Sequence, residues 1–154
     1  MNPADLEEFA AFRPAWPAFA VYFFGVLVFT AGPQLNPNTH ISPALGQLIA
    51  SLFLAFILIK RFANLYRVGP QGLTHESTFP GRHQEHVTME QIRRIDLRRG
   101  ISQRLLGVAH VHIYVEGKEA PALKIFGVPR PESFRRLLLD LGARDDQVLG
   151  AWRR

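Results

Sequence analysis

The chain contains one long stretch, residues 14–59, without a single Asp, Glu, Lys or Arg. Two apolar runs lie within this stretch, at residues 16–31 and 44–59. Both runs are apolar on every side when drawn as helices, and the rest of the chain is too short to bury two such helices in a soluble core. The stretch therefore predicts a transmembrane hairpin over residues 14–62, with helices at about residues 15–32 and 43–62.

Composition supports insertion of the second run into a bilayer. Ten of its residues are Leu, Ile or Phe, which at roughly −0.3 to −0.6 kcal/mol each favour insertion by about 3 to 6 kcal/mol. A run of this length spans roughly 24 Å as a helix, against a hydrocarbon core of about 30 Å. Trp16, Lys60 and Arg61 flank the runs and can cover the difference by reaching the interface.

The distribution of basic residues predicts the orientation of the hairpin. The connecting loop, residues 32–43, is rich in Pro, Gly and Asn and lacks Lys and Arg, whereas Arg13 precedes the first helix and Lys60, Arg61 and Arg67 follow the second. By the positive-inside rule the loop lies outside and both termini are cytoplasmic. Residues 1–13 form an acidic cytoplasmic leader. Its negative charge is unlike the start of a signal peptide, so the first helix is expected to stay as an anchor.

After residue 63 the hydrophobic period changes from helical to two, which is typical of strands with one buried face. The pattern predicts an antiparallel sheet, because the links are too short for crossover helices. The predicted strands lie near residues 66–68, 72–78, 84–88, 94–98, 109–115 and 122–126. Pro131, Glu132 and Gly142 then mark the start and end of a last amphipathic helix. A small sheet or partly open barrel capped by a C-terminal helix is expected over residues 63–154.

Three segments, residues 91–97, 103–111 and 125–131, resemble the bacterial pleckstrin-homology-like (PH-like) domain of membrane-flanked proteins. The resemblance implies one or two transmembrane helices before the domain, a place in the bacterial inner membrane, and a role in binding lipid or protein. The fold class expected is therefore membrane α + β, a transmembrane helical hairpin followed by a PH-like antiparallel β-domain. At the turn Arg104–Gly107, Leu105 and Leu106 are expected to tuck beneath the sheet, and Gly107 to allow a sharp turn into the next strand.

The candidate binding residues are basic. Five arginines crowd one predicted strand and the turn after it: Arg93, Arg94, Arg98, Arg99 and Arg104. A solvated charged face, a contact with anionic lipid headgroups and docking to an acidic protein surface all fit this cluster. Nucleic acid does not fit, because the arginines are not interleaved with exposed aromatic residues.

Catalytic and metal sites are not predicted. The sequence shows no nucleophile paired with a base, no glycine-rich phosphate loop and no cysteine. His110 and His112 can point to one side of a strand, with His83 and His86 as possible neighbours, but two histidines are too few for a zinc site. A protein without cofactor or metal, not an enzyme, is therefore expected, with a small metal-dependent enzyme as the distant alternative.

Small residues in the hairpin are candidates for helix–helix packing, either with each other or with a partner helix. They are Gly25, Gly46, Ala50, Ser51 and Ala55. Together these features predict a non-catalytic, membrane-anchored binding protein, an accessory, assembly or scaffolding component of an inner-membrane complex. Its expected partners are the lipid bilayer and another integral membrane protein or complex. The alternative is a sensor of anionic lipid headgroups.

Overall fold

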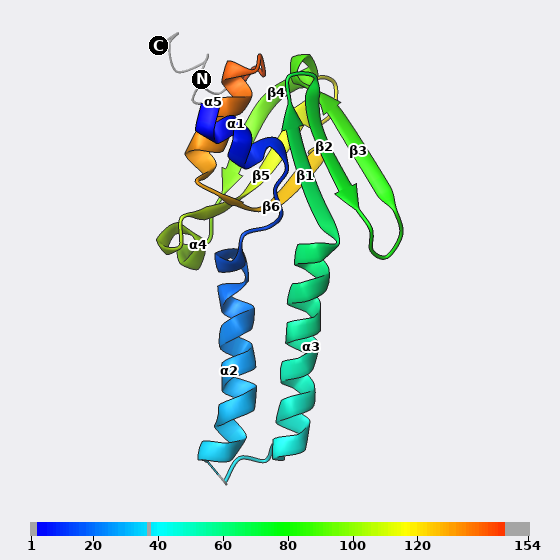
Figure 1. Cartoon of the computed structure of the whole chain (residues 1–154). Helices are drawn as coiled ribbons and strands as arrows, with labels where there is room; N and C mark the ends of the chain where they lie inside the picture. Colours follow the sequence, from blue (N-terminus) through cyan, green and yellow to red (C-terminus); the bar gives the residue numbers. More distant parts are fainter. Residues whose placement is uncertain (1–2, 37, 147–154) are drawn as a thin grey trace.

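The computed structural model describes residues 3–36 and 38–146. It consists of a long helical hairpin and a β-domain that stands on the open end of the hairpin (Figure 1). The hairpin contains a 3₁₀ turn, η1 (Trp16–Phe19), and the helices α2 (Ala20–Leu35) and α3 (Pro43–Phe62). A short helix, α1 (Pro3–Ala10), precedes the hairpin and lies on the β-domain.

Local chemistry explains where the hairpin helices end and how they meet. Ser42 caps α3 by accepting a hydrogen bond from the Leu45 N–H, and Pro43 occupies the first turn. The first helix continues beyond its predicted end at residue 32, since α2 ends at Leu35 and contains Pro33. Pro33 leaves the Phe29 carbonyl without its helical donor, and Gly46 of α3 lies against that oxygen, where an added Cβ would come within 2.4 Å.

Each of the segments 16–35 and 43–62 has 20 residues and is long and apolar enough to cross a membrane by length and composition. The protein itself buries few of their residues. Outward-facing side chains along both helices, including Phe24, Leu27 and Leu52, remain more than half exposed. These features support an association with a membrane.

The β-domain is built from six strands in two antiparallel, three-stranded sheets. One sheet has the order β1 (Asn64–Gly69), β2 (Gly72–Ser77), β3 (His83–Thr88), and the other β4 (Ile92–Arg98), β5 (Val108–Val115), β6 (Leu123–Pro129). The six predicted strands and their antiparallel pairing are confirmed. The expected single sheet is instead two sheets that share one core, and α5 (Pro131–Asp140) packs against that core.

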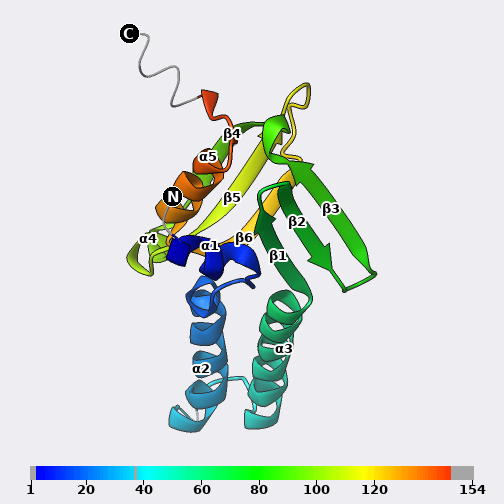
Figure 2. The same cartoon turned by 45° about the horizontal axis from the view of Figure 1, so that its top comes forward.

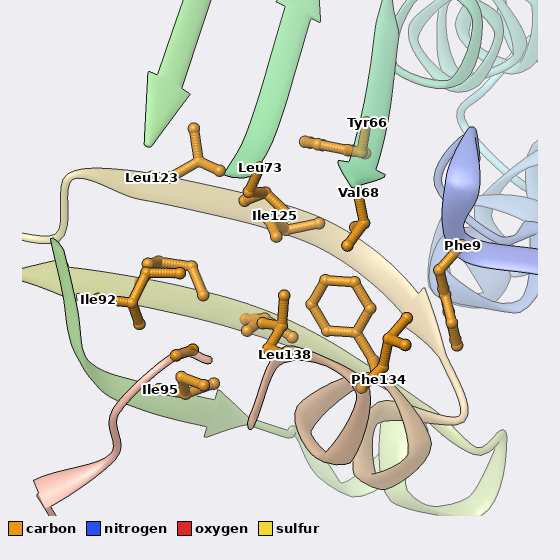
Figure 3. Packing of buried hydrophobic residues seen from close by; sticks show 14 of the residues in the cluster. Phe9, Tyr66, Val68, Leu73, Ile92, Ile95, Leu123, Ile125, Phe134 and Leu138 are labelled. Atoms are coloured by element: carbon orange, nitrogen blue, oxygen red, sulfur yellow. The ribbon is translucent and has the colours of Figure 1, made fainter. Parts of the chain in front are cut away.

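The alternating apolar residues of both sheets point into this core (Figure 3). Leu73 from the first sheet and Ile95 and Ile125 from the second are almost completely buried, together with Phe134 and Leu138 of α5. Burial of each such side chain contributes roughly 1.5 to 3 kcal/mol. The amphipathic face predicted for the last helix is therefore the face that closes the domain.

The N-terminal segment also belongs to this core, which differs from the separate leader expected over residues 1–13. Phe9 is 0% exposed and Phe12 is 8% exposed. Both rings pack edge-on against Phe134, with centroids 5.1 and 5.6 Å away. Phe12 and Tyr66 exchange two backbone hydrogen bonds of 2.8 and 2.9 Å. The β-domain is therefore assembled from residues on both sides of the hairpin (Figure 2).

Gly127 allows the chain to pass from the leader into the hairpin close to β6. The Ala15 N–H donates to the Gly127 carbonyl at 2.9 Å, and Gly127 has a φ of 62°. An added Cβ at this position would lie 2.6 Å from the Cβ of Ala18. A glycine is needed here both for its backbone conformation and for the close approach of η1.

The expected burial of Leu105 and Leu106 is wrong. They lie at the end of the short helix α4 (Ile101–Leu105), where Leu105 is 85% exposed and Leu106 is 42% exposed. Phe134, Leu137 and Leu138 of α5 already fill the space under β4 and β5, so the turn stands away from the sheet. Gly107, with a φ of 66°, turns the chain into β5 as expected.

Candidate functional site

The five predicted arginines separate into two groups at opposite ends of β4. Arg93 and Arg94 lie near the β5–β6 turn, where both are paired. Arg93 donates to Glu116, and this hydrogen bond raises the pKa of Arg93 and lowers that of the Glu116 carboxyl. Arg94 donates to Asp96 at 2.8 Å and lies over the Tyr114 ring, 4.2 Å from its centroid. This group is tied down by contacts within the domain.

Arg98, Arg99 and Arg104 lie at the other end of β4, in a groove of about 490 Å³ between β4, α4 and α5. We call it the arginine groove; it is lined by Ile95, Asp96, Leu97, Arg98, Arg99, Arg104, Glu132 and Arg135. Strand β4 supplies its floor, α4 contributes Arg104, and α5 contributes the last two residues. Four basic and two acidic side chains thus meet on one surface.

Two of the groove's arginines are already neutralised. Arg99 donates to Glu132 at 2.5 Å, and the Nε of Arg135 donates to Asp145 at 2.9 Å, a carboxylate that is 2% exposed. The guanidinium groups of Arg98 and Arg104 have neither a hydrogen bond nor an ion pair with any residue in the described part of the chain. Their exposed guanidinium groups can therefore bind a carboxylate or phosphate, which guanidinium contacts through two parallel hydrogen bonds.

A smaller hollow of about 240 Å³ adjoins the groove and shares Arg99, Arg104 and Glu132 with it. It adds Arg130, which has a φ of 44° and forms an ion pair with Glu8 of α1. Sequence reasoning did not include Arg130, Glu132 or Arg135 in the site. These residues come from a segment about thirty positions away, and only the packing of α5 against β4 brings them to Arg99.

A family model described as bacterial PH domain matches residues 18–142, which is most of the chain. The chain belongs to this family. The resemblance seen in the sequence is thereby confirmed, and the match covers the hairpin and the β-domain together while beginning after α1. Neither the search of curated proteins nor that of solved structures gave a match. PH-like domains generally bind rather than catalyse, which points to a binding or sensor role.

His110 and His112 of the bacterial PH domain sit on β5, opposite Arg98 and Asp96 of β4. Burial lowers the pKa of both histidines. His110 stacks on Phe126 at 4.3 Å, its Nδ1 accepts a hydrogen bond from the Gly127 N–H at 3.2 Å, and its Nε2 lies 2.7 Å from the Gln103 amide. These contacts give His110 a structural role at the junction of α4, β6 and η1.

His83 and His86 are on β3, in the other sheet of the PH domain. Across residues 3–36 and 38–146, no three His, Cys, Asp or Glu side chains lie close enough together to hold a metal ion. The structure therefore does not bring the four histidines together.

The small residues of the hairpin divide between two surfaces. Gly25 faces Phe53, whose ring would lie 3.1 Å from an added Cβ, and Gly46 and Ala50 are buried between α2 and α3. Ser51 and Ala55 are exposed, and the Ser51 hydroxyl donates to the Gln47 carbonyl within its own helix. The first three thus pack the hairpin, whereas the last two remain accessible to another helix.

Proposed function

We propose that this chain is a non-catalytic binding protein of the bacterial inner membrane, an accessory, assembly or scaffolding component of a membrane complex. The hairpin crosses the membrane twice, and the PH domain and both termini lie in the cytoplasm. The arginine groove binds an acidic segment of another integral membrane protein.

Aromatic and cationic pairs at the domain end of the hairpin support its insertion. Arg61 lies over the Trp16 ring at 4.2 Å, and Arg13 over the Phe62 ring at 5.3 Å. Such pairs are typical of the level where lipid headgroups meet the hydrocarbon core. The opposite end of the hairpin carries no Lys or Arg, which favours the orientation with the domain inside.

The unpaired guanidinium groups of Arg98 and Arg104 are the main observation that supports an acidic partner. The groove is not uniformly basic, because Asp96 and Glu132 lie beside them. A mixed surface of this kind fits a polypeptide, which presents carboxylates together with N–H donors, better than it fits a bare anion.

Site-specific crosslinking in cells tests this proposal. A photo-reactive amino acid replaces Ser133, which lines the hollow adjoining the groove, and the full-length chain is isolated in mild detergent. We expect one membrane protein to be crosslinked, and the adduct to fall at least fivefold in the R98Q/R104Q variant. The matched control, K118Q/K124Q, removes two exposed charges elsewhere on the domain and should keep the adduct. Equal adducts in both variants would overturn the role of the groove.

Binding of anionic lipid headgroups is the second candidate, because Arg104 lies on α4 beside the start of α2 (Figure 1). In the same crosslinking experiment this function predicts an adduct with phospholipid that depends on Arg98 and Arg104. It also predicts loss of the adduct in nanodiscs of phosphatidylcholine alone. An adduct with neither protein nor lipid would contradict both candidates.

The orientation has its own test, since the chain contains no cysteine. Asn38→Cys places a thiol in the loop between α2 and α3. We expect a membrane-impermeant thiol reagent to label it in intact spheroplasts. Labelling only after lysis would show that the loop faces the cytoplasm.

A further inference from the structure

Exposed hydrophobic side chains of the PH domain concentrate at two tips. Among the described residues after the hairpin, the large hydrophobic residues that lie exposed are Phe79 (59%), Ile101 (85%), Leu105 (85%) and Leu106 (42%). Phe79 is in the turn between β2 and β3, and the other three are on α4 or directly after it. The remaining large apolar side chains of the domain are mostly in its core.

The β2–β3 tip is held at the end of α3. Thr78, directly before Phe79, donates its N–H to the carbonyl of Ala63 at 2.9 Å. Ala63 is the residue that follows α3. Figures 1 and 2 both show this turn beside the domain end of α3. Phe79 is therefore placed close to the level of Phe62 and its cation partner, Arg13.

The α4 tip is held at the start of α2. Ser102 and Gln103 line a hollow of about 260 Å³ together with Pro17, Ala20 and Val21 of η1 and α2. The contact of Gln103 with His110 fixes α4 in this place. Both views show α4 beside α2, on the side of the hairpin away from the β2–β3 tip.

We propose that both tips insert their apolar side chains into the membrane leaflet that surrounds the hairpin, so that the domain rests on the bilayer at two points. Apolar surface on α4 adjoins the exposed face of α2, where Val21 is also exposed, and an exposed apolar area of this kind marks a contact surface. Arg82 follows the first tip. Basic residues at this depth contact anionic headgroups while neighbouring Leu, Ile and Phe reach the acyl chains.

This inference rests on the proposed insertion of the hairpin, and single-cysteine variants separate the two claims. The full-length chain is labelled with an environment-sensitive fluorophore at Phe79→Cys or Leu105→Cys and placed in two sets of nanodiscs, whose lipids carry bromine either near the headgroup end or near the middle of the acyl chain. Leu54→Cys, in the middle of α3, reports on the hairpin. Lys118→Cys, in the β5–β6 turn at the opposite end of the domain, is the water-exposed control (Figure 1).

We expect brominated lipid to quench the labels at positions 79 and 105 at least twofold more than the label at position 118. Quenching at position 54 alone would overturn the two-point contact while leaving the membrane hairpin intact. No quenching at position 54 would instead refute the hairpin itself, and the inference with it. Unfolding curves matching the parent confirm that each variant is folded.

Discussion

The N-terminal leader and the α4 turn are both short segments with two large apolar residues close together, but the residues are buried in the first segment and exposed in the second. Phe9 and Phe12 of the leader are buried in the core of the domain. Leu105 and Leu106 at α4 are exposed, although the sequence predicted them to be buried. Hydrophobicity is similar in the two segments, so it does not explain the difference.

The difference follows from the space left by the rest of the domain. Two sheets and one helix leave an opening near Phe134 and Tyr66, and the leader fills it with Phe9 and Phe12. Around the turn after β4 the core is already filled, because Phe134, Leu137 and Leu138 of α5 are buried in it. The comparison shows that part of the core of a small domain can come from residues that precede the hairpin in the chain. Four predictions test this conclusion.

The largest effect is expected from Phe12→Ala. Removing a buried phenylalanine costs about 3 to 5 kcal/mol, a large share of the about 5 to 15 kcal/mol that stabilises a typical domain. The full-length variant in detergent should unfold at a much lower temperature, as followed by circular dichroism. Phe24→Ala, on the exposed side of α2, is the matched control and should change little. If Phe12→Ala melts like the parent, the leader is not part of the core.

An intermediate effect is expected from Gly127→Ala, where the leader passes into the hairpin. The added Cβ meets Ala18 at 2.6 Å on a backbone with φ of 62°, which predicts a loss of about 1 to 3 kcal/mol. Gly117→Ala is the control, because its φ is also positive but nothing lies within 4 Å. Chemical denaturation of both variants separates steric overlap from backbone strain. Equal losses would mean that η1 does not approach β6 this closely.

A smaller effect is expected from pH, through His110, which connects α4 with β6 and η1. Burial is the larger cause and the nearby His112 the smaller cause that lower the pKa of His110 from its ordinary value of 6.5. At a pH between the folded-state and unfolded-state pKa of His110, the unfolded chain binds more protons than the folded chain. The stabilisation that neutral His110 gives the fold is therefore complete above about pH 6.5 and declines as pH falls. The melting temperature of the parent should therefore drop from pH 7.5 to 5.5.

His110→Gln tests the assignment of this pH dependence, because it should make the drop smaller. The exposed His83→Gln is the control and should retain the full drop. A His110→Gln variant with the parent's pH dependence would place the effect at other groups.

The smallest effect is expected from Leu105→Ser. The side chain is exposed, so the change should alter the free energy of unfolding by no more than about 0.5 kcal/mol. Leu138→Ala, in the core, should cost about 2 to 5 kcal/mol in the same denaturation experiment. A loss at Leu105 as large as that at Leu138 would show that the α4 turn packs against the domain.

The candidate site likewise has one property that the sequence predicts and one that depends on the tertiary structure. Arg98, Arg99 and Arg104 stand out in the sequence because they are close together along the chain. Which of them is free depends on partners from distant segments, because Glu132 neutralises Arg99 while Arg98 and Arg104 have no ion pair within residues 3–36 and 38–146. No local pattern predicts an ion pair between residues 33 positions apart.

The sequence by itself determined the hairpin helices, the six strands and the last helix, because hydrophobic period, proline and glycine act within a few residues. The alternation in β5 and the four-residue spacing of Phe134 and Leu138 in α5 are local patterns of this kind. Only the tertiary structure decided that the strands divide into two sheets, that Phe9 and Phe12 complete the core and that α4 stays outside it. Burial depends on the volume that all elements leave between them, and that volume is a property of the whole fold.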